Sequence, residues 1–335
     1  MTQTLLPADL LTQFAAKQAA KRAQRRQFFR NAGGLGVGMI GGTILAACGG
    51  SDGDDAVAQT PPPAGPSDAD ILNFALNLEY LEAQFYLYAV SGNGLPDNQK
   101  TGAGRPVGPV TPGRQVTFTD PLVSQYAREI AADEQAHVVF LRQALGSAAA
   151  AHPAIDVGFQ DPNGAFSTVA RAAGLVGPGQ IFDPYLNDDN FLLGAFIFED
   201  VGVTAYKGAA PLITNKTFLE AAAGILAAEA YHAALVRTVL YARGVATPAL
   251  RTNAEAISNA RDLTDGTSED KDQGITGTDP AVSNIVPLDA NGIAFSRTTG
   301  DVLNIVYINA GAVTQGGFLP AGINGAGSLN TSSAA

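Results

Sequence analysis

The tetrapeptides Glu134-Gln135-Ala136-His137 and Glu229-Ala230-Tyr231-His232 decide the fold class of this 335-residue chain. Both have the pattern Glu-x-x-His, and together they contain two of the three histidines. In an α-helix, residues three positions apart lie on one face about one turn from each other, so a glutamate and a histidine at this spacing can bind the same metal ion. A single pattern of this kind is common by chance, whereas two of them indicate a metal site between helices.

Two further glutamates occupy matching positions elsewhere in the chain. Glu79 is followed by Tyr86 and Glu199 by Tyr206, in each case seven residues later and therefore on the same helix face. The order Glu…Tyr and then Glu-x-x-His thus occurs twice, which indicates an internal repeat of a helix pair. Glu82 lies one turn after Glu79 and is a candidate for an additional ligand.

Four long predicted helices contain these residues, at 71–90, 122–145, 190–210 and 216–243. Capping residues precede them, such as Thr214 before the fourth helix, and glycine or proline follows their ends. Apolar residues occupy almost every face of the helices, so the helices must be buried against one another. The predicted fold is therefore an all-α four-helix bundle made of two helix pairs with a long crossover between them.

The predicted bundle occupies residues 67–243, with residues 147–187 as the long crossover. Residues 244–335 form an irregular C-terminal extension, which either packs on the bundle or is partly loose. We expect two short helices in this extension, at 254–263 and 300–308.

Six side chains from the four helices are the predicted metal ligands: Glu79, Glu134, His137, Glu199, Glu229 and His232. Buried carboxylates in an apolar bundle repel one another and lose their hydration unless cations neutralise them. Two divalent cations would balance four carboxylates, and ligands that are mostly oxygen favour iron or manganese and also accept zinc. The alternative is a metal-free polar core, in which the imidazoles and carboxylates hydrogen-bond to one another.

The order of the helices also predicts how the ligands divide. We expect the first helix pair to hold one ion and the second pair to hold the other, with the glutamates of the two Glu-x-x-His patterns shared. Tyr86, Tyr206 and Glu82 are expected beside the ligands rather than on the ions. Asp133 and Asp200, which neighbour ligands in the sequence, are expected to point elsewhere on their helices.

Residues 68 to about 243 resemble the ferritin-like superfamily, which includes bacterioferritin and rubrerythrin. The segment LNFALNLEYLEAQFY at 72–86 looks like exported ferritin-like proteins related to plant desiccation-related proteins. The resemblance implies a four-helix bundle that binds iron or manganese, and it leaves the activity open. The loop at 91–119 and the C-terminal extension are unlike a ferritin cage subunit, and the single cysteine excludes a rubredoxin module with its cysteine pairs.

The composition excludes one class of partner. Hydrophobic residues make up 46% of the chain and charged residues 15%, which is enough apolar material for a large core. Residues 49–335 contain 14 basic and 30 acidic residues, a net charge of −16. Nucleic-acid binding requires a basic surface, so no nucleic-acid partner is expected.

The first 48 residues have the layout of a signal peptide. Arg25 and Arg26 lie in a basic region, a weakly apolar stretch follows at 31–47, and small residues precede Cys48. The layout resembles a twin-arginine export signal, which implies the twin-arginine machinery as a partner and a periplasmic or cell-envelope location. A basic amphipathic helix or a weak membrane anchor is the alternative. Residues 49–66 are a predicted flexible linker.

The residues around the single cysteine point to a lipid anchor. Leu45-Ala46-Ala47-Cys48 resembles a bacterial lipobox, which implies that Cys48 becomes the lipidated first residue of the mature chain. The alternative is an ordinary cleavage site with an incidental cysteine.

Three functions are compatible with these features. The first is a di-iron or di-manganese oxidoreductase that acts on O₂ or peroxide. The second is a non-catalytic envelope or desiccation-stress protein on the same scaffold, and the third is metal sequestration without turnover. Homo-oligomer formation is a further expectation.

Overall fold

The structure, a computed structural model, describes residues 65–266, 270–277, 279 and 281–334. Residues 65–287 and 294–335 form one compact unit. Residues 288–293 belong to a separate unit and form a turn, in which the Asp289 amide donates to the Ile293 carbonyl at 2.9 Å. The predicted signal peptide with Arg25, Arg26 and Cys48 lies outside the described residues, as does nearly all of the predicted linker.

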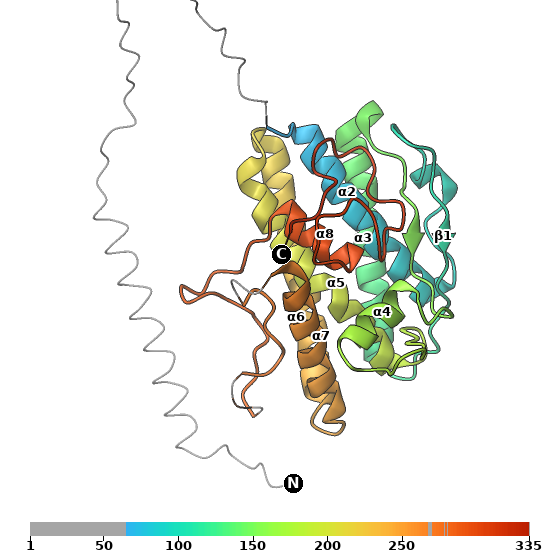
Figure 1. Cartoon of the computed structure of the whole chain (residues 1–335), viewed down its shortest axis with the longest axis vertical. Helices are drawn as coiled ribbons and strands as arrows, with labels where there is room; N and C mark the ends of the chain where they lie inside the picture. Colours follow the sequence, from blue (N-terminus) through green and yellow to red (C-terminus); the bar gives the residue numbers. More distant parts are fainter. Residues whose placement is uncertain (1–64, 267–269, 278, 280, 335) are drawn as a thin grey trace, which may run out of the picture. The chain divides into compact units, whose positions relative to one another are not determined.

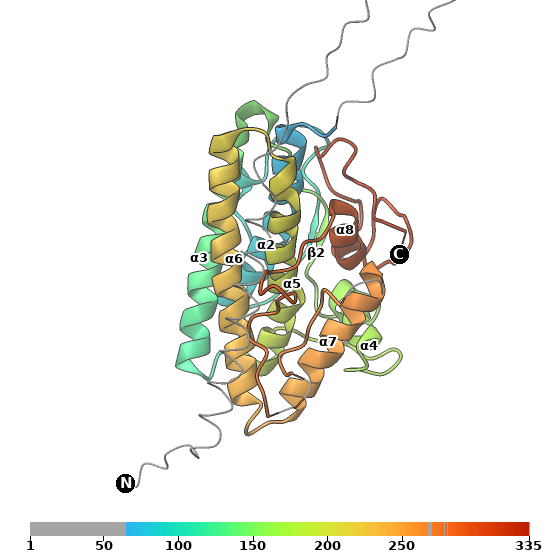
Figure 2. The same ribbon diagram turned by 90° about the vertical axis from the view of Figure 1, so that its left-hand side faces the viewer.

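Four long helices form the centre of the described chain: α2 (Asp68–Ser91), α3 (Pro121–Leu145), α5 (Asp188–Ala209) and α6 (Lys216–Arg243). α2 packs along α3 and α5 along α6, and α2 also contacts α5 (Figure 1). Figure 2 shows α3 and α6 running alongside each other on the face away from the C-terminal helices. The predicted all-α four-helix bundle is confirmed.

The start of α6 differs from the prediction. Thr214 does not cap the helix, because its hydroxyl donates to Asp68 at 3.0 Å. The cap is Asn215, whose side-chain oxygen accepts from the amides of Thr217 at 2.9 Å and Phe218 at 3.3 Å. Asp68 at the start of α2 therefore ties the two helix starts together.

Shorter elements connect and cover the bundle. These are η1 (Asp97–Gln99), β1 (Val110–Thr111), η2 (Gly146–Ala148), β2 (Ile155–Asp156), α4 (Ala165–Ala172), η3 (Ala210–Leu212), α7 (Ala249–Asp265) and α8 (Thr299–Tyr307). β2 and α4 lie in the crossover between α3 and α5, and β2 pairs in parallel with β1 from the loop after α2. α7 is longer than the predicted 254–263 because it begins directly after Pro248 and buries Leu250.

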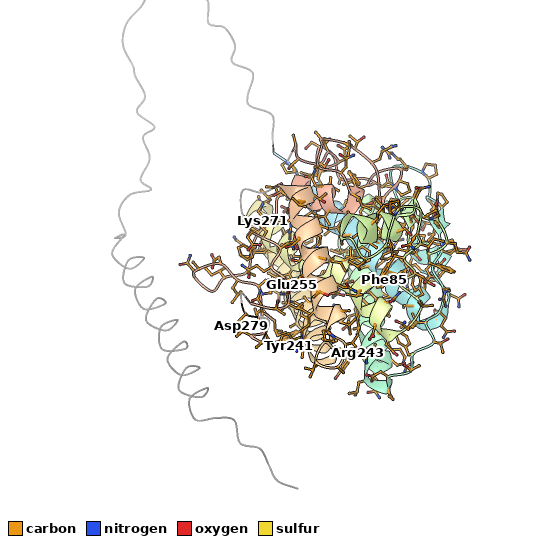
Figure 3. The ribbon with its side chains drawn as sticks, turned by 60° about the horizontal axis from the view of Figure 1, so that its bottom comes forward. Phe85, Tyr241, Arg243, Glu255, Lys271 and Asp279 are labelled. Carbon is orange, nitrogen blue, oxygen red and sulfur yellow. The ribbon has the colours of Figure 1, made fainter. Side chains whose placement is uncertain are left out.

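The C-terminal extension packs on the bundle. α7 contacts α4, α5, α6 and α8. The side chain of Asn77 in the middle of α2 makes two hydrogen bonds of 2.8 Å with the backbone of Asn324: its Nδ2 donates to the Asn324 carbonyl, and its Oδ1 accepts from the Asn324 amide. Figure 3 marks Glu255 on α7, which accepts from the amide and hydroxyl of Thr276 at 2.7 Å, and Lys271, which pairs with Asp301 at 3.0 Å.

A buried set of charges fixes this extension, and we call it the arginine–aspartate cluster: Arg237, Arg261, Arg297, Asp200, Asp265 and Asp272. Asp200 of α5 accepts from Arg237 of α6 at 2.7 Å and from Arg261 of α7 at 3.0 Å. Arg297 pairs with Asp265 at 2.6 Å and also with Asp272. Three arginines and three aspartates leave the cluster without net charge.

α6 combines its length with an apolar composition. Among the described helices it is the one long and apolar enough to cross a membrane by length and hydropathy. Its inner face, however, buries Glu229, His232 and Arg237, each of which contacts residues from other helices. In this fold α6 is a helix of the bundle.

Candidate metal centre

The four long helices bring all six predicted ligand side chains to one place in the core. Glu79 comes from α2, Glu199 from α5, and the two Glu-x-x-His patterns come from α3 and α6. The four glutamates are at most 1% exposed. Their donor atoms form two groups in which all atoms lie within 4.8 Å of one another, and Glu134 belongs to both groups.

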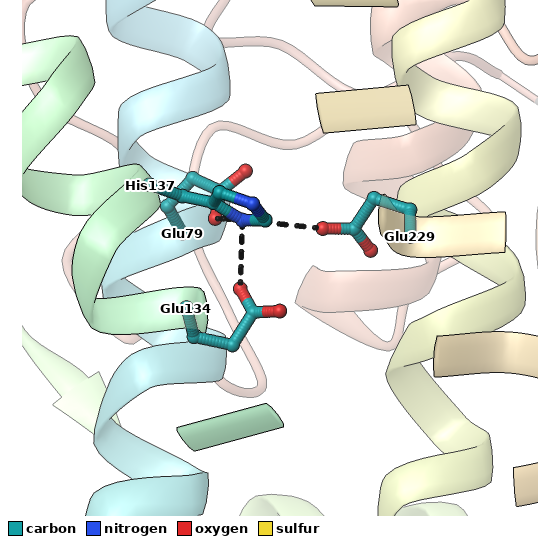
Figure 4. A group of neighbouring side chains, drawn as sticks. All are labelled: Glu79, Glu134, His137 and Glu229. Atoms are coloured by element: carbon teal, nitrogen blue, oxygen red, sulfur yellow. Dashed lines mark hydrogen bonds and ion pairs between the residues drawn. The ribbon is translucent and has the colours of Figure 1, made fainter. Parts of the chain in front are cut away.

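The first group surrounds His137 and is drawn in Figure 4. Nδ1 of His137 lies 3.1 Å from Glu79 Oε2, 3.6 Å from Glu134 Oε2 and 3.8 Å from Glu229 Oε1. Four side chains from α2, α3 and α6 therefore offer donor atoms to a single point. We call this the His137 position.

The second group surrounds His232 and has three donors. Nδ1 of His232 lies 3.1 Å from Glu134 Oε1 and 3.7 Å from Glu199 Oε2. We call this the His232 position. Glu134 directs one oxygen to each position, as a bridging carboxylate would. Glu229 was expected to join His232 and to be shared between the two ions; in the structure its carboxylate is grouped with His137.

Several polar atoms of the centre lack hydrogen-bond partners within the described structure. Both carboxylate oxygens of Glu134 and of Glu229, one of Glu199, and Nδ1 of His232 are buried without a hydrogen bond. Buried polar atoms are almost always hydrogen-bonded, and buried carboxylates carry a large desolvation cost when nothing compensates them. A pair of cations would compensate them, so these residues fit a two-metal site better than a metal-free polar core.

The electrostatics separate Glu134 from the other carboxyl groups. Burial raises the pKa of Glu134, but the close approach of the His137 and His232 imidazoles, at 3.6 and 3.1 Å, outweighs it and brings the pKa to about 2. Burial by itself would lower the pKa of the two imidazoles. The neighbouring carboxylates outweigh this effect, so that the pKa of His137 is raised to about 11 and that of His232 to about 9. Without metal, Glu134 is thus a carboxylate between two imidazolium ions.

Burial makes the remaining glutamates retain their protons to a higher pH than an exposed glutamate would. Burial, followed by repulsion from Glu134, raises the pKa of Glu79 to about 7. Burial likewise raises the pKa of Glu199 to about 8. The pKa values of Glu229 and Glu82 lie well above the ordinary value, because of burial and then of neighbouring carboxylates. Metal binding must therefore displace several protons.

The two tyrosines contact the ligands in a crossed arrangement. Tyr86 of α2 donates a hydrogen bond to Glu199 of α5, and Tyr206 of α5 donates one to Glu79 of α2. Burial raises the pKa of both tyrosines well above the ordinary value, so both stay protonated donors. Each tyrosine therefore fixes the glutamate of the other helix pair, whereas the sequence related it only to the glutamate of its own helix.

Glu82 lies beside the centre opposite a glycine. Its side chain is buried, and the equivalent position of the repeat is Gly202 on α5. A Cβ atom at Gly202 would lie 2.3 Å from Glu229 Oε2 and 3.5 Å from Glu82 Oε1. A side chain at position 202 would therefore displace the Glu229 carboxylate from its present place, which makes Gly202 a residue of the centre that the ligand pattern does not reveal.

Asp133 also belongs to the centre, although the sequence suggested that it points elsewhere. Its Oδ2 lies 3.2 Å from Nε2 of His232, the ring nitrogen that faces away from the ligand group. The side chain reaches from α3 to α6 between two neighbouring helices, a contact that spacing along one helix cannot predict. Asp200 does point away from the centre, into the arginine–aspartate cluster.

Comparison with known proteins defines the class to which the fold and the site belong. Residues 67–242, more than half of the chain, match the family model described as a ferritin-like domain. The chain belongs to this family, and the predicted resemblance is confirmed.

Two individual proteins are similar to this chain over most of its length. The chain is 28% identical over 272 residues to the ferritin-like catalase Nec2 of Nesocodon mauritianus, covering 77% of this chain and 84% of the relative. It is 30% identical over 264 residues to the desiccation-related protein PCC13-62 of Craterostigma plantagineum, covering 76% and 82%. No solved structure matches the chain.

Proposed function

We propose that this protein is a di-metal oxidoreductase with iron or manganese that acts on peroxide, and that it disproportionates hydrogen peroxide. The observation that supports the proposal most strongly is the set of buried donor atoms without hydrogen-bond partners, from Glu134, Glu199, Glu229 and His232. The relative named a ferritin-like catalase directs the choice of substrate to peroxide. In the reaction, one peroxide is reduced to two waters and a second is oxidised to O₂, so that electrons and protons balance.

The residues of the chain would bind and orient the reacting centre. Glu79, Glu134, Glu199, Glu229, His137 and His232 would hold the ions, and the ions would supply the change of valence that breaks the O–O bond. Tyr86 keeps Glu199 in place and Tyr206 keeps Glu79 in place, through their hydrogen bonds. The apolar helices around the centre exclude bulk water, which strengthens the interactions between these groups.

The test measures metal content and peroxide turnover in the full chain. Protein that is exported by its own signal and purified without chelator is expected to contain about two iron or manganese ions, by plasma mass spectrometry. The same preparation is expected to evolve O₂ from hydrogen peroxide. The Glu134→Gln variant is expected to lose both properties, because Glu134 belongs to both donor groups. Folded wild-type protein that binds no metal, even after reconstitution, would contradict the proposal.

A second candidate function follows from the other relative. Similarity to a desiccation-related protein favours a structural role in the cell envelope, without turnover. In that case chelation should leave the melting temperature unchanged, since no ligand would stabilise the folded state. A clear fall of the melting temperature on chelation would count against this second candidate.

We also propose that the chain is exported by the twin-arginine route and anchored through Cys48. The arginine pair and the small residues before the only cysteine support this proposal. Mass spectrometry of the mature N-terminus is expected to find a lipidated Cys48. An unmodified Cys48, or a mature chain that starts beyond it, would refute the anchor and leave the export route to be tested with an Arg25→Lys, Arg26→Lys double variant.

A further inference from the structure

The two halves of the repeat differ at two positions next to the ligands. The residue before the Glu-x-x-His pattern is Asp133 on α3 and Ala228 on α6. The residue one turn after the first glutamate is Glu82 on α2 and Gly202 on α5. The centre is therefore built by a repeat, but its two metal positions have different surroundings.

The number of donor groups differs between the positions. Four side chains converge on the His137 position and three on the His232 position, with Glu134 counted in both. The difference comes from Glu229, whose Oε1 lies 3.8 Å from Nδ1 of His137. Gly202 permits this orientation, because any side chain there would occupy the space of the other Glu229 oxygen. An ion with fewer protein donors is held less tightly and keeps more coordination places for exogenous ligands.

The histidines differ in what supports them. Nε2 of His232 lies 3.2 Å from Asp133, so the carboxylate fixes the ring with Nδ1 directed at the ligand group. Within the part of the chain that the structure describes, His137 has carboxylate neighbours only on its Nδ1 side. Ala228, the counterpart of Asp133, has no group that could support His137. A carboxylate behind a ligating histidine orients the ring and increases its basicity.

Exposure distinguishes the positions as well. The Asp133 side chain is 47% exposed, whereas the His232 side chain that it contacts is 7% exposed. Asp133 thus connects the His232 position to the surface between α3 and α6. The histidines themselves do not follow this order, because the His137 side chain is 13% exposed; what is particular to the His232 position is the carboxylate that leads from it to solvent.

We infer that the two metal positions are unequal: the His137 position retains its ion, and the His232 position exchanges its ion and accepts the small oxygen ligand. In this assignment Asp133 is a positioning residue. It supports His232, and this support partly compensates for the fourth donor that the His232 position lacks. The inference rests on the proposed two-metal centre and adds to it which ion is the labile one.

The test is a titration of Mn²⁺ into the metal-free full chain, followed by competition with a chelator of known affinity. Two binding steps are expected, with dissociation constants at least tenfold apart. His232→Gln should remove the weaker step and His137→Gln the tighter step. Asp133→Asn should weaken the weaker step by about 10–100-fold, the effect typical of a carboxylate behind a ligating histidine, and leave the tighter step unchanged.

Controls separate a positioning role from general effects. Glu129→Gln removes the same charge from an exposed site on α3 and should change neither step. Asp133→Glu should restore part of the lost affinity. The melting temperature of each metal-free variant shows whether the fold is intact, and a variant that fails to fold is replaced by Asp133→Ser.

The outcomes distinguish this inference from the function on which it rests. Two steps of equal affinity, or an Asp133→Asn variant that weakens both steps or neither, would overturn the inequality and leave the two-metal centre standing. A wild-type protein that binds no Mn²⁺ in either step would contradict the two-metal centre itself.

Discussion

Two neighbouring residues of helix α5 belong to two different buried clusters of charged side chains. Glu199 of α5 points into the metal centre, and Asp200, the next residue, points into the arginine–aspartate cluster. In the arginine–aspartate cluster every carboxylate has an arginine within 3.0 Å. In the metal centre, five buried carboxyl groups face only two imidazoles.

The difference shows how one fold separates structure from chemistry. A charge set that the protein balances with its own arginines has no capacity left for a cation, and it serves to hold α7 and the following chain on the bundle. A charge set that is left short of positive charge retains protons, and under the proposed function it exchanges them for metal. Single substitutions should therefore affect stability in one cluster and metal binding in the other.

The largest effect is expected from Arg297→Leu in the balanced cluster. This change leaves Asp265 and Asp272 buried without their common partner, and breaking a buried ion pair costs about 3–5 kcal/mol. Urea denaturation should show the same loss of stability with and without metal. Arg128→Leu, at an exposed site on α3, is the control and should stay within about 0.5 kcal/mol. A loss that appears only in the metal-loaded protein would break the comparison.

Glu229→Gln in the metal centre should have the opposite profile. The Glu229 carboxyl is protonated in the metal-free protein because burial raises its pKa, so an amide of the same shape should leave metal-free stability nearly unchanged. Metal affinity should fall by about 100-fold, or ~2.7 kcal/mol, because a donor is lost. Calorimetric titration with Mn²⁺ and urea denaturation under chelator measure the two effects. A strongly destabilised metal-free variant would show that Glu229 has a structural role instead.

The pH dependence of stability should also separate the clusters. The pKa of Glu79 is raised from 4.5 to about 7, that of Glu199 from 4.5 to about 8, and that of His232 from 6.5 to about 9. The folded metal-free protein thus binds more protons than the unfolded chain between about pH 5 and pH 9, and its stability must fall as pH rises through this window.

Each such proton contributes ~1.4 kcal/mol per pH unit, and Glu134, whose pKa is lowered to about 2, acts in the opposite direction only below pH 4.5. Thermal unfolding with chelator from pH 5 to pH 9 measures the slope. With saturating metal the slope should flatten or reverse, because metal competes with these protons. A metal-free melting temperature that rises across this range would contradict the assigned pKa directions.

The smallest effect is expected from the crossed tyrosines. Tyr86→Phe removes the hydrogen bond to Glu199 and should cost about 1 kcal/mol of stability. It should also weaken metal binding by about tenfold, because Glu199 loses the group that orients it. Tyr185→Phe, which removes a buried hydroxyl that donates to the Val157 carbonyl at 2.9 Å, is the matched control and should leave metal affinity unchanged.

The bundle, and the convergence of the six side chains from its helices, could be predicted because their signals are local and repeated. The spacing Glu-x-x-His by itself places two side chains on one helix face, and its second occurrence indicates that the two helix pairs are related by a repeat. The capping and breaking residues placed the long helices to within a few residues, apart from the Asn215 cap.

The contacts that could not be predicted join helices that are remote in sequence. Arg297 and Asp265 are separated by 32 residues, and Asp133 and His232 by 99, so no spacing rule relates them. The orientation of Glu229 toward His137 could not be predicted either, for a related reason. Its orientation depends on the absence of a side chain at Gly202, which is a property of packing between helices and not of either helix alone.

The pair of hydrogen bonds between Asn77 and Asn324 has a consequence for the biogenesis of the protein. These residues are 247 positions apart, and Asn324 lies close to the end of the 335-residue chain. A ribosome must therefore release almost the whole polypeptide before the first long helix can make these contacts. Completion of the native packing therefore waits until the segment around Asn324 has been made, long after the first helix has left the ribosome.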